Sequence, residues 1–109
     1  MRKNEYTSLD QFTSQYTGEW GPSDGHWYGL DFLWRGKEYR FNTGSMYNAE
    51  NTILPDGQEA IFGLYLKEEK YKLLGEYACI DDALESKVIG GVPFRDVIMD
   101  ENTELIGQD

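Results

Sequence analysis

The sequence contains very little of the chemistry on which small enzymes depend. Its 109 residues include one cysteine, Cys79, and one histidine, His26. A single cysteine excludes an intrachain disulfide, and this pair cannot supply the ligands of an ordinary zinc site. Because chains without disulfides are typical of a reducing compartment, we expect a cytoplasmic protein. Since the sequence contains no metal-binding or cofactor motif, we also expect no cofactor or metal.

Long apolar runs are also missing. No stretch of the sequence approaches the roughly 20 apolar residues that a membrane-spanning helix requires. Residues 1–5 lead into no apolar segment of the kind found in signal peptides. We therefore expect no membrane partner. The length suits a single domain over residues 1–109, which is large enough to bury a core.

Positive charge is scarce and unevenly distributed. The formal net charge is -10, from 20 acidic and 10 basic residues. In residues 76–109 nine acidic residues accompany only two basic ones, Lys87 and Arg95. This charge opposes contact with nucleic-acid phosphates, so we expect no direct nucleic-acid binding. It favours a protein partner with a basic surface.

Aromatic residues are abundant, at 15% of the chain. Each aromatic ring can bury about 150–250 Å², so these side chains can supply much of a core. The first predicted element is a helix, because Ser8–Gln11 matches a capping box and Gly18 is a plausible stop. Leu9, Phe12 and Tyr16 would lie on one face of this helix.

Two β-hairpins are predicted after the helix. Over residues 27–43 the side chains alternate about a turn at Arg35-Gly36-Lys37, with Tyr28, Leu30, Phe32 and Trp34 on one face. A strong turn at residues 55–57 precedes the second hairpin, in which residues 60–66 and 71–77 flank a turn at 67–70. One face of its return strand would carry Tyr71, Leu73, Gly75 and Tyr77. The prediction is an α+β fold with a four-stranded antiparallel sheet over about 27–77.

The last third is predicted to be helical in short pieces. Asp81 can cap a helix that runs to Lys87, and Gly90-Gly91 would break it. Pro93 suits the first turn of a further helix, whose inward face would carry Phe94, Val97 and Ile98. Leu105 and Ile106 form a short apolar pair that suits an edge strand.

Catalytic and calcium-binding interpretations are weak. A catalytic interpretation pairs His26 with Asp24, Asp31 or Cys79, as a general base or in a nucleophilic pair. However, Cys79 follows an apolar strand, where we expect a buried, inert thiol. Residues 100–104 resemble the start of a calcium loop, yet Leu105 stands where an EF-hand requires glycine. We therefore expect that the protein is not an enzyme.

Two surfaces remain as candidate binding sites. The strand from Trp27 to Trp34 carries large rings on both faces, so either the first helix or the 44–58 loop covers them, or Trp27 or Tyr28 lies on a binding surface. The second candidate is the acidic third, which is either a solvated face or a mimic of nucleic-acid phosphates. Asp96 and Asp100 would share one helix face. The acidic candidates are Asp81, Asp82, Glu85, Asp96, Asp100, Glu101 and Glu104.

The chain resembles the small inhibitors encoded by phages and mobile genetic elements, including anti-CRISPR and antirestriction proteins. The stretch Gly25–Phe32 with Tyr39–Phe41 looks like a distinct family signature, but it is not what carries this resemblance. The resemblance lies in size, in acidic charge and in the absence of catalytic groups over the whole chain, and it rests on no specific motif. It implies a non-enzymatic inhibitor that blocks the basic nucleic-acid-binding surface of a nuclease, such as an RNA-guided nuclease. The alternative is an immunity-type or ligand-binding module that uses an aromatic sheet face.

Overall fold

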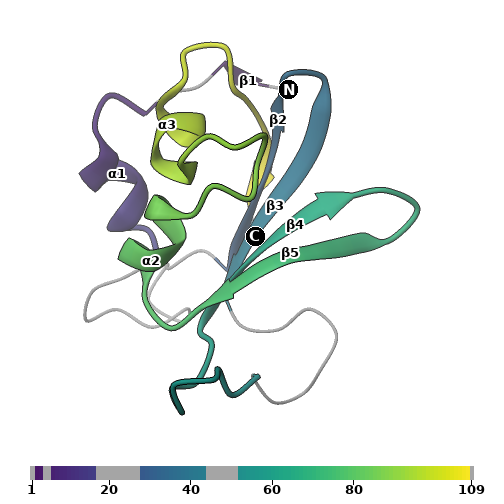
Figure 1. Cartoon of the computed structure of the whole chain (residues 1–109). Helices are drawn as coiled ribbons and strands as arrows, with labels where there is room; N and C mark the ends of the chain where they lie inside the picture. Colours follow the sequence, from purple (N-terminus) through teal and green to yellow (C-terminus); the bar gives the residue numbers. More distant parts are fainter. Residues whose placement is uncertain (1, 4–5, 17–27, 44–51, 109) are drawn as a thin grey trace.

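The sheet has more strands than the sequence predicts. The computed structural model describes residues 2–3, 6–16, 28–43 and 52–108. Within these ranges six strands form one antiparallel sheet in the order β1-β6-β2-β3-β4-β5, accompanied by three short helices (Figure 1). The α+β class is confirmed. The predicted four strands were too few because the sheet also includes β6 and the two-residue strand β1 (Arg2–Lys3), from the two ends of the chain.

The first predicted hairpin is confirmed as β2 (Gly29–Trp34) and β3 (Lys37–Thr43). Its turn consists of Arg35 and Gly36, with φ values of 49° and 80°. Positive φ at both central residues is the type I′ geometry that matches the twist of a two-residue hairpin. The register that this turn sets places the inward side chains of β2 in the core, whereas Tyr28 precedes the strand and is 55% exposed.

The second hairpin comprises β4 (Phe62–Lys67) and β5 (Tyr71–Tyr77). Leu64 pairs with Gly75 and Tyr65 with Leu73, so Leu74 is an extra residue in β5. Such a bulge changes which face the following side chains occupy. The predicted common face of Tyr71, Leu73, Gly75 and Tyr77 was therefore wrong. Leu73 is 43% exposed, and Leu74 packs against the core.

The C-terminal strand lies inside the sheet. β6 (Glu104–Gln108) pairs with β2 on one side and with β1 on the other. The strand predicted at Leu105 and Ile106 is thus confirmed, but its predicted position at the edge is wrong. Leu105 lies opposite Phe32 and is buried, so an inward apolar side chain explains why this segment is drawn into the sheet.

The first helix, α1, spans Leu9–Thr13. The oxygen of the Ser8 side chain accepts a hydrogen bond from the backbone N–H of Gln11 at 3.4 Å, which confirms the predicted N-cap. The side-chain oxygen of Gln11 accepts from the backbone N–H of Thr7 at 2.6 Å, one residue before the usual partner in a capping box. The predicted stop at Gly18 lies outside the described residues.

The other helices, α2 (Ile80–Glu85) and α3 (Phe94–Met99), are shorter than predicted. The N-cap of α2 is Cys79, so Asp81 is in the first turn instead of at the cap. Pro93 is the N-cap residue of α3 and not a residue of its first turn. Gly90 and Gly91 separate the helices in a turn with φ values of 59° and 74°, which confirms the predicted break.

All three helices cover one face of the sheet (Figure 1). The ring of Phe41 on β3 lies at the centre of the resulting core. Its centroid is 5.0–5.5 Å from four other aromatic centroids, those of Phe12, Tyr16, Phe62 and Phe94. The predicted inward face of α3 is confirmed, since Phe94, Val97 and Ile98 are buried. The residues predicted for the face of α1 also lie at the core, but α1 ends at Thr13, so Tyr16 reaches the core from the turn after the helix. We call the opposite face of the sheet the outer face. Among the described elements, no helix covers it.

Candidate functional site

The acidic residues of the helical layer fall into groups with different surroundings. Asp81 and Asp82 lie in the first turn of α2, and both are exposed. Within the described part of the chain neither carboxylate takes part in an ion pair or a side-chain hydrogen bond. Carboxylates in the first turn of a helix complement its dipole, which is worth roughly 0.3–1 kcal/mol each. Their position is thus favourable for α2 and leaves both charges directed at solvent.

Glu85 and Asp96 share a basic neighbour, Arg95. A guanidinium N–H of Arg95 donates to Glu85, and another nitrogen lies 3.9 Å from Asp96. All three side chains are exposed, so these ion pairs add little to stability. Their main consequence is electrostatic, because Arg95 partly neutralises the negative charge where α2 and α3 meet.

Asp100 has a structural role. Because α3 ends at Met99, the predicted pairing of Asp96 with Asp100 along one helix face is wrong. One carboxylate oxygen of Asp100 accepts from the backbone N–H of Asn102 at 2.9 Å, and the other accepts from the indole N–H of Trp34 at 3.0 Å. These bonds, that of Asn102 first and that of Trp34 second, lower the pKa of Asp100.

Because the pKa of Asp100 is lowered, we expect the free energy of unfolding to depend on pH. The unfolded chain binds a proton at Asp100 near pH 3.9, above the folded pKa, so the contribution is present above about pH 3.9 and is lost as the pH falls through the folded pKa. Asp100→Asn should therefore lower the melting temperature at pH 7 and have no effect below the folded pKa. Thermal unfolding monitored by circular dichroism from pH 2 to 7 measures the difference. A constant difference across this range would contradict this role.

The remaining candidates are dispersed. Glu101 is exposed in the turn after α3, whereas Glu104 is half-buried in β6, opposite Leu33 of β2. Tyr28 is exposed beside the start of β2, and its backbone oxygen accepts two bonds from Thr43. Trp27 lies outside the described residues. The structure therefore brings together Glu85 of α2 and Asp96 of α3 at Arg95.

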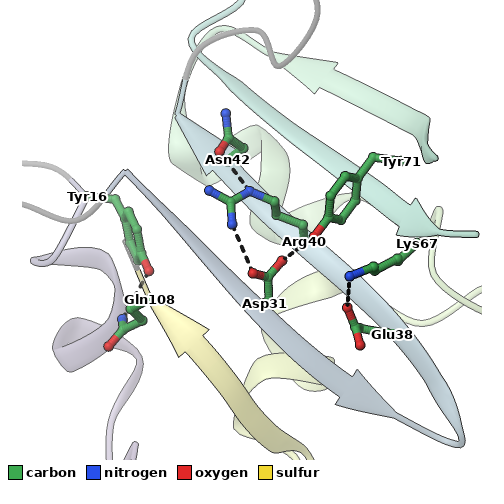
Figure 2. Close-up of polar contacts among 8 residues, drawn as sticks. All are labelled: Tyr16, Asp31, Glu38, Arg40, Asn42, Lys67, Tyr71 and Gln108. Atoms are coloured by element: carbon green, nitrogen blue, oxygen red, sulfur yellow. Dashed lines mark hydrogen bonds and ion pairs between the residues drawn. The ribbon is translucent and has the colours of Figure 1, made fainter. Parts of the chain in front are cut away.

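The outer face carries a polar network that we did not predict from the sequence (Figure 2). Arg40 of β3 donates to Asp31 of β2 at 3.0 Å and to the side-chain oxygen of Asn42 at 2.9 Å. The hydroxyl of Tyr71 donates to the other oxygen of Asp31 at 3.1 Å. The side chain of Arg40 is only 9% exposed, and that of Asp31 is 23% exposed. A second ion pair lies beside the network, between Lys67 and Glu38, whose charged atoms are 3.3 Å apart.

The cross-strand register explains this network. Asp31 lies directly opposite Arg40 in the β2–β3 hairpin, so their side chains occupy the same face. Gly29 leaves room beside them, because a Cβ atom there would force the guanidinium of Arg40 to shift. The signal in the sequence was the opposite charge of two residues at equal distances from the Arg35-Gly36 turn. Because both carboxylate oxygens of Asp31 already accept hydrogen bonds, the network serves the fold.

The catalytic candidates gain no support. Cys79 is exposed at the N-cap of α2, so the expectation of a buried thiol was wrong. Its predicted partner His26 lies outside the described residues. Among the residues that the structure describes, no three histidine, cysteine or acidic side chains are grouped so that they could hold a metal ion. No helix in this part of the chain is long and apolar enough to cross a membrane.

Comparison of the chain with protein-family models, with curated proteins and with solved structures gave no match.

Proposed function

We propose that this protein is a non-enzymatic inhibitor that uses the acidic surface of α2 and α3 to bind a basic, nucleic-acid-binding surface of a nuclease, as an anti-CRISPR protein does. The observation that carries this proposal is the exposed pair Asp81 and Asp82, whose charges no described basic side chain neutralises. Glu101 extends the same acidic helical layer beyond α3. Complementary charge accelerates encounter with a basic cleft and disfavours other partners.

Arg95 limits how closely the charge distribution of this surface resembles that of DNA. A nucleic acid presents an unbroken row of charges, about one per 1.7 Å of duplex axis. Here the guanidinium of Arg95 interrupts the row between Glu85 and Asp96. The surface therefore supports charge-directed binding at two separated acidic positions, α2's first turn and the turn after α3, better than it supports a continuous mimic of a phosphate backbone.

The proposal predicts a selective loss of binding when the first turn of α2 is neutralised. Asp81→Asn with Asp82→Asn should weaken binding to a guide-loaded RNA-guided nuclease about tenfold, because complementary charges contribute to encounter and affinity. The same change should lower stability by no more than about 2 kcal/mol, through the lost helix-dipole interaction. Titration calorimetry and thermal unfolding give the two values.

A matched control is available in the turn between β4 and β5. Glu68→Gln with Glu69→Gln removes the same charge from two exposed residues on a different part of the molecule. This control should bind like the wild type. Equal weakening by both double variants would show that only net charge matters, and unchanged binding by the first would remove α2 from the interface.

The alternative function uses an aromatic surface, and the 55% exposure of Tyr28 is the observation that favours it. Within β2 itself the large rings of Phe32 and Trp34 both face the core, so the strand contributes no aromatic ring to the outer face. An aromatic contact should respond little to ionic strength, whereas binding through Asp81 and Asp82 should weaken as salt rises. Tyr28→Ala would weaken binding only in the aromatic case.

A further inference from the structure

β5 forms one end of the sheet, and the described residues place no strand beyond it (Figure 1). It is seven residues long, whereas β1 at the opposite end has two residues. None of the residues of β5 is buried, although four of the six residues of β4 are. A strand in this position presents backbone N–H and C=O groups that can pair with an added strand.

A second copy of this chain is a poor occupant of the edge. An antiparallel pairing centred on Lys72 or on Glu76 would place like charges opposite each other. A pairing centred on Leu74 would match Lys72 with Glu76, but the bulge at Leu74 puts these two side chains on different faces of the sheet. Pairing of β5 with itself is therefore disfavoured in each of these registers. Two copies of a chain with a net charge of -10 also repel each other, so the edge is better suited to a different chain.

The negative charge beside this edge indicates that the added strand carries basic side chains. From Leu73 to Ser86 the sequence contains Glu76, Asp81, Asp82 and Glu85 and no basic residue. The helix α2 follows β5 directly and contacts it. Glu76 is half-exposed, and no ion pair of its carboxylate occurs within the described residues. The end of β5 nearest α2 is thus a backbone edge in an acidic setting.

We infer that the part of this edge at Gly75–Tyr77 pairs with an extended basic segment of the partner, which adds a short strand to the sheet. This inference rests on the proposed function, since it names the segment of a basic partner that the protein recognises. Main-chain hydrogen bonds would provide affinity, as in other cases of strand addition. Glu76 and the first turn of α2 would select basic side chains over acidic ones.

An eight-residue peptide of alternating lysine and valine is a suitable probe. Titrated into the isotope-labelled full chain, it should shift the backbone amide resonances of residues 72–77. Two control peptides have the same sequence but carry N-methyl groups on alternate backbone nitrogens, one on the odd-numbered and the other on the even-numbered residues. Each keeps its charge and loses the hydrogen-bond donors along one edge. The methylated peptide that lacks the donors facing β5 should bind about tenfold more weakly than the unmethylated one, since each net hydrogen bond contributes about 0.5–1.5 kcal/mol.

Glu76→Lys provides the matched protein variant. It should weaken binding of the lysine peptide and strengthen binding of the corresponding glutamate–valine peptide. Equal affinity of all N-methylated forms, or resonance shifts confined to α2, would overturn strand addition and leave charge-directed binding intact. No binding of either peptide would also overturn it. The proposed function fails separately, when the Asp81 and Asp82 double variant binds the nuclease as tightly as the wild type.

Discussion

Replacement of Phe41 by alanine should lower the free energy of unfolding by about 4 kcal/mol. The Phe41 ring is fully buried and lies against four other aromatic rings, contributed by α1, β4, α3 and the turn after α1. Its removal leaves a cavity where the helices pack on the sheet, and the surrounding rigid rings cannot easily collapse into that space. A loss of this size is a large part of the 5–15 kcal/mol typical of a domain.

Urea unfolding followed by circular dichroism measures this loss. Leu73→Ala is the matched control, because Leu73 is a large apolar residue of the same sheet that is 43% exposed. It should cost less than about 1 kcal/mol, since little apolar area is removed from contact. Similar losses for the two variants would mean that Phe41 is not at the centre of the core.

The second large effect is expected on the outer face. Asp31→Ala leaves the guanidinium of Arg40, only 9% exposed, without its carboxylate partner and should destabilise the fold by about 3 kcal/mol. It also removes the acceptor of the Tyr71 hydroxyl. The partial exposure of Asp31 limits the effect, because water can reach the vacated position.

The double replacement Asp31→Leu with Arg40→Met separates pairing from burial. Apolar side chains of similar size can replace an ion pair of low exposure at little cost, so the double variant should recover most of the stability lost in Asp31→Ala. A double-mutant cycle by urea unfolding gives the coupling free energy. Additive losses would show that Asp31 and Arg40 contribute independently of each other.

Local sequence patterns predicted the elements in which neighbouring residues determine the structure. The Ser8 cap, the Gly90-Gly91 break and the turn predicted at Arg35-Gly36-Lys37 each depend on a few consecutive residues, and each was found, although Lys37 already belongs to β3. The alternation of β2 likewise placed Phe32 and Trp34 on one face, because strand side chains alternate with a period of two, and the structure shows that this face is buried.

The features that the sequence did not predict are long-range. The insertion of β6 beside β2 depends on contacts such as Leu105 with Phe32, which local periodicity cannot indicate. The bond between Trp34 and Asp100 joins residues 66 positions apart, and it turned a predicted surface acid into a structural one. The bulge at Leu74 shifted the alternation of β5, and although the adjacent Gly75 is a residue type that often accompanies a bulge, the alternation alone predicted an unbroken face.

The same distinction applies to the candidate binding residues. Exposure of Asp81 and Asp82 followed from their place at the start of a short helix, which the sequence indicated, although Asp81 was predicted as its cap. The partial neutralisation of Glu85 and Asp96 by Arg95 required the contact between α2 and α3, which only the structure shows. The acidic surface is consequently narrower than the list of acidic residues suggested.

Binding to a guide-loaded RNA-guided nuclease at low and high salt, with target DNA as competitor, tests the proposed function most directly. Binding through Asp81 and Asp82 predicts a complex that forms at low ionic strength, weakens steeply as salt is added, and is displaced by target DNA. A complex that is insensitive to both salt and DNA would contradict binding at a basic nucleic-acid surface. The absence of a complex at either salt concentration would exclude this nuclease as the target.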